Sequence, residues 1–180
     1  IKESETFIYF AQHFKSKGLP VPSVLAISDD YTYYIQEDVG NTSLLEVLEK
    51  EGKNDFVMGL FKKSLSALAA LQVQGSEGLD YKHCLTSKEF GASSIMSDLL
   101  YFKYYFLDTL QFPYDKQALM HEFELLSEQL ASKDFNYFLF RDFQSRNIMI
   151  KEDEVFFIDF QGGMQGGLSY DVASLLWQAK

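Results

Sequence analysis

Apolar residues recur at helical spacing along much of the chain. Positions three or four apart carry the apolar side chains in five stretches, a pattern typical of amphipathic helices. These stretches are residues 3–17, 44–50, 56–73, 96–110 and 115–131. Gly18 and Pro20 end the first helix, and Thr42 or Ser43 is expected to cap the second.

Shorter apolar runs separated by polar turns predict strands. Residues 24–27 and 31–37 form one candidate hairpin, and residues 148–150 and 155–158 form a second one around a four-residue turn. A last helix is expected near the end of the sequence, with Ser169 or Asp171 as its cap. Helices mixed with short hairpins predict an α+β fold.

Three polar residues are expected to converge at the second hairpin. Asn147 precedes its first strand and Asp159 follows its second strand, so antiparallel pairing places both at the same end. The loop that carries Asp142 leads into this end. Oxygen ligands suit Mg²⁺, and a loop carboxylate can accept a proton from an attacking hydroxyl. The alternative is that all three are solvated residues that flank strands.

Three motifs in the last forty residues together resemble a known family. They are residues 141–147 (RDFQSRN), 158–161 (IDFQ) and 170–175 (YDVASL). The motifs are similar to those of the aminoglycoside phosphotransferase and choline kinase family, small-molecule relatives of the protein kinases. Within it, they most resemble bacterial cell-wall sugar kinases, which phosphorylate the anomeric hydroxyl of N-acetylmuramate or N-acetylglucosamine. One departure is Phe140, where the family usually has His.

The resemblance implies a protein-kinase-like α+β fold of two lobes with a mostly helical C-terminal lobe. Residues 1–40 would be the remnant of an N-terminal lobe, comprising a helix, two strands and the hinge between the lobes. Residues 41–180 would be the C-terminal catalytic lobe, itself incomplete. We therefore expect a piece of a longer protein, whose glycine-rich loop and phosphate-binding Lys precede Ile1.

The resemblance also implies ATP and Mg²⁺ as cofactors. Asn147 and Asp159 would hold the metal, and Asp142 would be the catalytic base. Glu3, with Glu5 in reserve, would pair with the upstream Lys. An acidic first turn that stabilises the helix dipole is the alternative for both glutamates.

The family's hinge binds the adenine edge through its backbone, which implies contacts from the Gln36 carbonyl and the Asp38 N–H. Asp171 would be buried and would support the catalytic loop by accepting backbone hydrogen bonds. Arg141 and Arg146 could each contact a phosphate or an acidic substrate group, or could pair with Asp171 or Glu152.

An aromatic segment is the candidate acceptor site. On a helix, Asp98, Tyr101 and Tyr105 fall on one face. They would form a wall for a sugar ring or a cationic headgroup, with Asp98 binding hydroxyl groups. The alternative is a buried helix of the large lobe.

Composition restricts the partners. The net charge of −10 argues against nucleic-acid and anionic-membrane partners, because no basic surplus is present to neutralise phosphates. The single cysteine, Cys84, is compatible with a reducing cytoplasm. We expect no membrane-spanning segment, and the oligomeric state stays open.

The sequence therefore predicts an ATP-dependent phosphotransferase that acts on a small-molecule hydroxyl, most directly on an amino sugar of cell-wall type. These 180 residues alone are expected to be weak or inactive. An aminoglycoside or choline kinase is the first alternative. A non-catalytic nucleotide-binding or interaction module is the second.

Overall fold

The computed structural model of the protein describes residues 2–131 and 137–178, in an α+β arrangement. Its helices are α1 (Lys2–Ser16), α2 (Leu44–Glu51), α3 (Asp55–Ser76), α4 (Ala92–Phe102), α5 (Lys116–Ala131) and α6 (Ser169–Gln178). Its strands are β1 (Val24–Ile27), β2 (Tyr34–Gln36), β3 (Tyr137–Leu139), β4 (Ile148–Lys151), β5 (Glu154–Phe157) and β6 (Met164–Gly166). The described part also contains the 3₁₀ turns Tyr81–His83 and Ser145–Asn147 and the π-helical turn Lys103–Leu107.

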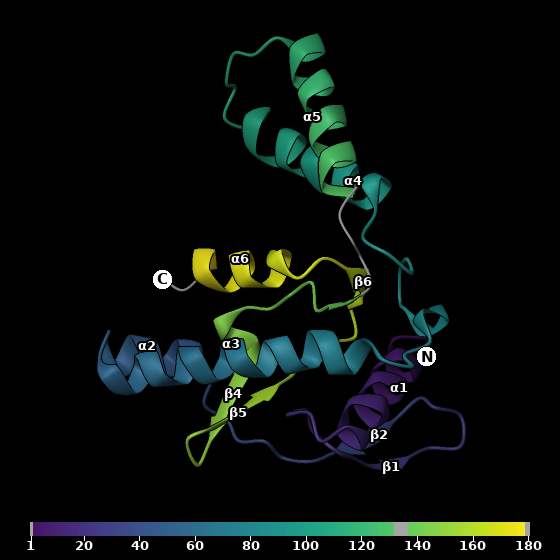
Figure 1. The fold of residues 1–180 in the computed structure, drawn as a ribbon, viewed down its shortest axis with the longest axis vertical. Helices are drawn as coiled ribbons and strands as arrows, with labels where there is room; N and C mark the ends of the chain where they lie inside the picture. Colours follow the sequence, from purple (N-terminus) through teal and green to yellow (C-terminus); the bar gives the residue numbers. More distant parts are fainter. Residues whose placement is uncertain (1, 132–136, 179–180) are drawn as a thin grey trace.

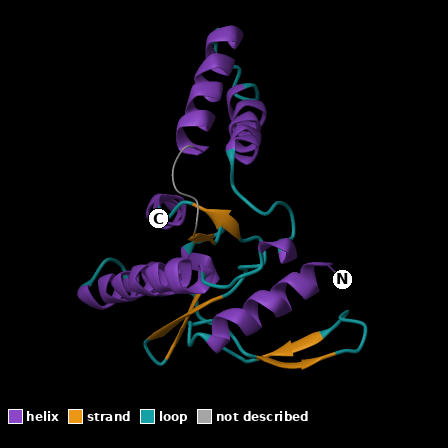
Figure 2. Ribbon diagram, turned by 45° about the vertical axis from the view of Figure 1, so that its right-hand side comes forward, coloured by secondary structure: helices purple, strands orange, loops and turns teal. Residues whose placement is uncertain are grey.

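The strands form antiparallel ribbons of two strands each, which are separate in space (Figure 2). Both predicted hairpins form, β1 with β2 and β4 with β5, although β2 is shorter than expected. The third ribbon pairs β3 with β6 and was not predicted, because its strands are distant in sequence. It fixes the chain immediately before residue 140.

Aromatic side chains on one face hold α1 in place. Phe10 and Phe14 lie one turn apart and are fully buried. Their ring centroids lie 5.5 and 4.8 Å from that of Phe138 on β3. Burying a Phe side chain contributes roughly 1.5–3 kcal/mol. Helix α1 is thereby packed against the strand that leads into the candidate catalytic loop.

Helix α3 runs through the middle of the body (Figure 1). Asn54 caps it by accepting a hydrogen bond from the Val57 N–H at 2.9 Å. Its buried face, which includes Leu68 and Leu71, lies against β3 and β5. Among the described residues, this one helix is long and apolar enough to cross a membrane by length and composition, a criterion that core helices also meet. The expectation of no membrane-spanning segment stays a prediction.

Helices α4 and α5 form a hairpin that projects away from the body (Figure 1). The predicted helix over residues 96–110 begins earlier, at Ala92, and changes to the π-helical turn at Lys103. Only Ile95 of α4 is buried, and many aromatic side chains of this region are exposed. The expectation of a buried helix is therefore wrong here.

The last helix begins at Ser169, so Asp171 lies inside its first turn. The expectation that Asp171 could be the residue capping this helix is therefore wrong. Its side chain is fully buried and points toward the chain around residue 140.

One hydrophobic core includes residues of α1, α2, α3, the ribbons and α6. It is continuous across residue 40, where the boundary between two lobes was expected. The division at that point stays a prediction.

Candidate active site

The β4–β5 hairpin brings Asn147 and Asp159 together. Ile148 pairs with Phe157, and the Ile158 N–H donates to the Asn147 carbonyl at 3.1 Å. Asn147 Nδ2 lies 3.4 Å from Asp159 Oδ2. The same nitrogen donates to the Asp142 carbonyl oxygen at 2.9 Å. The buried Asn147 side chain thus links all three residues at one end of the hairpin.

The oxygen atoms of this pair fit a magnesium ion. Asn147 uses its amide nitrogen for both hydrogen bonds, and within residues 2–131 and 137–178 its Oδ1 has no partner. Over the same residues, no group of three or more His, Cys, Asp or Glu side chains could hold a metal. Mg²⁺ commonly takes one or two protein oxygens and fills its other positions with water and substrate phosphates. Asn147 and Asp159 offer oxygen ligands of this kind and number.

Two residues of the site have a left-handed backbone. The φ angle is +78° at Arg141 and +66° at Asp159. Such conformations in residues other than glycine cost of the order of 1–3 kcal/mol and persist where surrounding contacts impose them. They lie next to Asp142 and at the proposed metal ligand, respectively.

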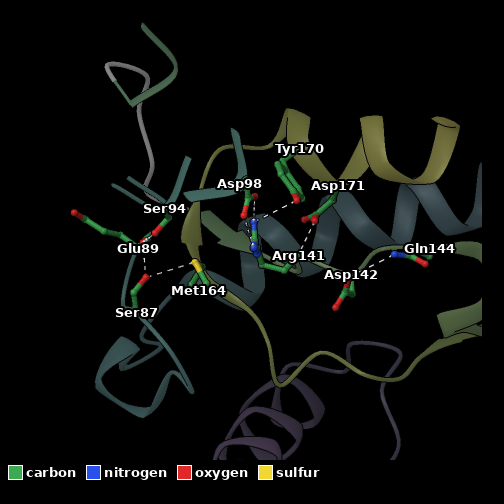
Figure 3. Close-up of polar contacts among 10 residues, drawn as sticks. All are labelled: Ser87, Glu89, Ser94, Asp98, Arg141, Asp142, Gln144, Met164, Tyr170 and Asp171. Carbon is green, nitrogen blue, oxygen red and sulfur yellow. Dashed lines mark hydrogen bonds and ion pairs between the residues drawn. The ribbon is translucent and has the colours of Figure 1, made fainter. Parts of the chain in front are cut away.

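Asp142 is exposed on its loop. Its Oδ1 accepts a long hydrogen bond of 3.4 Å from Gln144 Nε2. Its carboxylate points away from the neighbouring Asp98–Arg141 pair (Figure 3). A carboxylate with this exposure and this weak restraint can reach an incoming hydroxyl group.

Asp171 supports the loop from beneath. Its carboxylate accepts hydrogen bonds from the Phe140 N–H at 2.8 Å, the Arg141 N–H at 3.0 Å and Gln72 Nε2 at 2.8 Å. Burial raises the pKa of Asp171 to about 6, despite these hydrogen bonds, which favour the ionised form. Three donors on one carboxylate fix the start of the candidate catalytic loop.

Arg141 has a different partner from those expected. Its guanidinium binds both carboxylate oxygens of Asp98, at 2.7 and 3.3 Å, and donates to the Tyr170 hydroxyl at 3.2 Å (Figure 3). It also lies 4.6 Å from the Phe90 ring centroid. The ion pair that we considered between this side chain and Asp171 is therefore wrong, since Asp171 accepts a hydrogen bond from the Arg141 backbone and none from its guanidinium. The Asp98 carboxylate, expected to bind acceptor hydroxyls, is already paired.

Arg146 is exposed. Among the described residues it forms no ion pair at all, so the considered pairs with Asp171 and Glu152 are wrong for this arginine too.

Tyr101 and Tyr105 stack on each other, with ring centroids 4.3 Å apart. Their side chains are 65% and 67% exposed. They follow Asp98 along the same face of the helix, but they do not line the hollow that Asp98 and Arg141 share. An acceptor wall of all three residues would therefore need a ligand that extends beyond this hollow.

The two candidate glutamates of α1, Glu3 and Glu5, have different surroundings. Gln161 Nε2 donates to Glu3 Oε1 at 3.3 Å and to Asp159 Oδ1 at 2.9 Å. Glu5 instead borders a hollow with Tyr9 and other residues away from this site. The structure thus brings Glu3 near the hairpin end and leaves Glu5 apart.

The expected hinge includes the end of β2 and the residues after it. Gln36 is exposed and pairs with Val24 across the β1–β2 ribbon. The Asp38 carbonyl accepts a hydrogen bond from Lys151 Nζ at 2.8 Å, which ties this segment to the β4–β5 hairpin. Among the described residues the Asp38 N–H has no hydrogen-bond partner.

Sequence reasoning missed two glutamines. Gln161 connects Asp159 to Glu3, and its position two residues after Asp159 was the available signal. Gln72 lies in the middle of an apolar helical pattern and binds Asp171, which no local signal indicates.

Phe140 stands where the family usually has His, and its ring makes aromatic contacts. It is fully buried, and its ring makes edge contacts with Phe143, Phe157 and Phe160 at centroid distances of 5.3, 6.1 and 6.4 Å. The backbone bond to Asp171 does not depend on the side chain. The loop is therefore held here by apolar packing.

Comparison with known protein families gives a match over nearly the whole sequence. A family model described as the phosphotransferase enzyme family matches residues 2–179. The chain is 26% identical over 164 residues to an N-acetylmuramate/N-acetylglucosamine kinase of Neisseria meningitidis serogroup B, which covers 88% of this chain and 46% of that protein. A kinase of the same name from Pseudomonas aeruginosa is 24% identical over 178 residues, which covers 97% and 49%. The chain thus spans about half the length of the curated relatives it matches.

A solved structure shares the fold. It is a thermostable mutant of an aminoglycoside phosphotransferase, in ternary complex with ADP and hygromycin B. The TM-score is 0.60 at 18% identity, over 99% of this chain and 62% of that one. This likeness confirms the predicted protein-kinase-like α+β fold.

Proposed function

The chain belongs to the phosphotransferase enzyme family, and we propose that the protein transfers the γ-phosphoryl group of ATP to a hydroxyl group of a small molecule. The observation that carries this proposal is the convergence of Asn147 and Asp159, 3.4 Å apart, with the Asp142 carbonyl on the same amide nitrogen. Phosphoryl transfer requires mainly positioning and charge neutralisation, and this arrangement supplies groups for both.

Asp142 is the proposed base. The acceptor oxygen attacks the γ-phosphorus, the bond from that phosphorus to the bridging oxygen breaks, and ADP leaves with its electron pair. The hydroxyl proton passes to Asp142 Oδ1 or Oδ2. Gln144, at 3.4 Å, orients the carboxylate without neutralising it.

Asn147 Oδ1 and the Asp159 carboxylate would hold Mg²⁺. When bound, the ion neutralises the negative charge of the terminal phosphates. The buried position of Asn147 and the left-handed backbone of Asp159 keep these two oxygen donors in a fixed direction. Gln161 restrains the other oxygen of Asp159 and connects it to Glu3.

ATP would bind between the hairpin and the segment after β2. We propose the Gln36 carbonyl and the Asp38 N–H as contacts of the adenine edge, which is supported by the exposure of Gln36 and the unpartnered Asp38 N–H among the described residues. Glu3 would orient the phosphate-binding Lys that the family carries. Arg146, exposed and close to Asn147, is the proposed second contact for a phosphate or an acidic substrate group.

An amino sugar of the N-acetylmuramate or N-acetylglucosamine type is the proposed acceptor, because both reported relatives bear that name. A cationic acceptor such as an aminoglycoside or choline is the second candidate. The exposed stacked pair of Tyr101 and Tyr105 favours it, since aromatic faces attract cations. Phosphate transfer to a panel of sugars, aminoglycosides and amino alcohols separates the two.

We also propose that the protein acts in the cytoplasm on a free small molecule, with no nucleic-acid or membrane partner. The support is the single cysteine and the net charge of −10.

Replacing Asp142 by Asn in the full-length protein tests the reaction. The change keeps the shape of the side chain and removes the proton acceptor, so turnover should fall by about 10²–10⁴-fold while Mg·ATP binding measured by calorimetry stays. Unchanged turnover would exclude Asp142 as the base. If Mg·ATP binds to the unaltered protein and no member of the acceptor panel is phosphorylated, the non-catalytic alternative holds.

A further inference from the structure

A hollow of about 300 Å³ lies beside Arg141, where the start of α4 approaches β6. Its volume is at the lower end of the range for small-molecule sites. Five residues with a hydroxyl group in the side chain line it: Thr86, Ser87, Ser93, Ser94 and Ser97. Asp98, Arg141 and Met164 complete the wall.

Some of these hydroxyl groups already form hydrogen bonds within the protein, and others do not. Ser87 and Ser94 both donate to the Glu89 carbonyl, at 2.7 and 3.4 Å. Ser93 and Ser97 lie one turn apart on α4 and are exposed, and neither side chain has a hydrogen-bond partner among the described residues. Each of these two hydroxyls can both donate and accept, as can a sugar hydroxyl.

The charge of the hollow is balanced. Its carboxylate, Asp98, is bound by both terminal nitrogens of Arg141 at 2.7 and 3.3 Å. Recognition of an ammonium group is strongest with an uncompensated carboxylate. Paired in this way, Asp98 offers little to a polycationic ligand, whereas the hydroxyl groups around it suit a neutral one.

The hollow adjoins Arg141, the residue that precedes the proposed base. Arg141, which forms part of its wall, precedes Asp142 in the chain, and adjacent Cα atoms are about 3.8 Å apart. Asp142 points away from the Asp98–Arg141 pair, on the other side of the Arg141 backbone (Figure 3). A ligand seated in the hollow would therefore have to extend one hydroxyl group past Arg141 to reach Asp142.

We propose that this hydroxyl-lined hollow is the acceptor subsite, and that it selects a neutral, polyhydroxylated sugar over a polycationic acceptor. Ser93 and Ser97 bind hydroxyl groups of the sugar, and the Asp98–Arg141 pair forms the fixed floor. The inference rests on the proposed phosphotransferase function and adds the residues and the chemical class of its acceptor.

The test is steady-state kinetics of the full-length protein with N-acetylglucosamine as the acceptor. In the double variant Ser93→Ala/Ser97→Ala, two hydrogen bonds to the acceptor are lost, so KM for the sugar should rise at least about tenfold. KM for ATP should stay within twofold. Ser97→Phe fills the hollow instead of removing a bond, and it should abolish saturation by the sugar while Mg·ATP binding stays. Ser66→Ala is the matched control, because Ser66 is an exposed helical serine that lines a separate hollow between α3 and β5.

An unchanged KM for the sugar in both altered proteins would overturn the subsite while leaving the phosphotransferase function in place. A higher kcat/KM for kanamycin than for N-acetylglucosamine in the unaltered protein would overturn the selectivity for a neutral acceptor. Failure of the unaltered protein to phosphorylate any acceptor would instead overturn the proposed function, and this inference with it.

Discussion

The candidate active site at the β4–β5 hairpin and the α4–α5 hairpin are stabilised in different ways. Around Asp142, two buried polar side chains, Asn147 and Asp171, each make more than one hydrogen bond, and the aromatic core surrounds the loop. The α4–α5 hairpin projects from the body (Figure 1). Aromatic side chains of α4 such as Tyr101 and Phe102 are exposed, although Phe123 of α5 is buried. Among the described residues, Asp98 of α4 pairs with Arg141 at the start of the candidate catalytic loop.

This difference suggests a division of labour. Asn147 and Asp159, the proposed metal ligands, are each restrained by two hydrogen bonds, so that the loss of one bond should move them little, whereas the Asp142 side chain has a single long bond among the described residues. Helix α4, which carries part of the proposed acceptor subsite, has one buried side chain and is bound to Arg141 through Asp98. The following predictions test whether the two regions differ as this account requires.

The largest expected effect compares two carboxylates, one from each region. Asp171→Ala leaves two backbone N–H groups and the Gln72 amide without their buried acceptor, so the free energy of unfolding should fall by about 3–5 kcal/mol. Asp98→Ala removes a partly exposed ion pair and should cost about 1 kcal/mol or less. Urea unfolding of the full-length variants measures both. Equal losses would remove the contrast between the regions.

The α+β fold class could be predicted from the sequence because helices and hairpins depend on local rules, and the protein-kinase-like fold was predicted from the resemblance of three motifs to a known family. The chemistry of the site stays a prediction. Periodicity located the helices, and two apolar runs with a four-residue turn located the hairpin that joins Asn147 to Asp159. The β3–β6 pairing and the bond from Gln72 to Asp171 depend on residues far apart in the chain, and no local pattern encodes them. The pairing of Arg141 with Asp98, 43 residues apart, was missed for the same reason.

The second prediction concerns pH. Because burial raises the pKa of Asp171 to about 6, well above the usual value for an aspartate, the folded protein binds this proton more tightly than the unfolded chain does. The resulting stabilisation is fully present below about pH 4 and is lost as pH rises through about 6, and it amounts to as much as about 3 kcal/mol. Unfolding of the unaltered protein and of Asp171→Asn between pH 4 and 7 measures it. The free energy of unfolding of the unaltered protein, minus that of Asp171→Asn, should fall with rising pH. A rise would mean that the hydrogen bonds, and not burial, dominate this pKa.

The third prediction concerns Phe140. Restoring the histidine of the family with Phe140→His buries a polar ring among phenylalanines, which should lower the free energy of unfolding by about 1–3 kcal/mol. Turnover at saturating substrate should stay within a few fold, because the loop is held by the backbone bond to Asp171. Phe56→His, on the exposed side of α3, is the control and should be nearly neutral. A stabilised Phe140→His protein would show that a polar partner for the ring exists nearby.

The smallest expected effect is in the α4–α5 hairpin. Tyr105→Ala should change the free energy of unfolding by less than about 0.5 kcal/mol, because the side chain is 67% exposed. Phe157 of β5 is a fully buried aromatic residue, and Phe157→Ala should lower the free energy of unfolding by about 3–5 kcal/mol. A large loss for Tyr105→Ala, measured in the same urea titrations, would mean that the hairpin is more firmly packed than its exposure indicates.

The central claim is that Asn147 and Asp159 present their oxygen atoms to one metal ion. Its most direct measurement is the binding of Mn²⁺, as a paramagnetic substitute for Mg²⁺, to the full-length protein with ATP, followed by electron paramagnetic resonance. The account predicts that Asp159→Ala weakens Mn²⁺ binding at least about tenfold, as removal of one of two protein ligands should. Mn²⁺ affinity equal to that of the unaltered protein would contradict it.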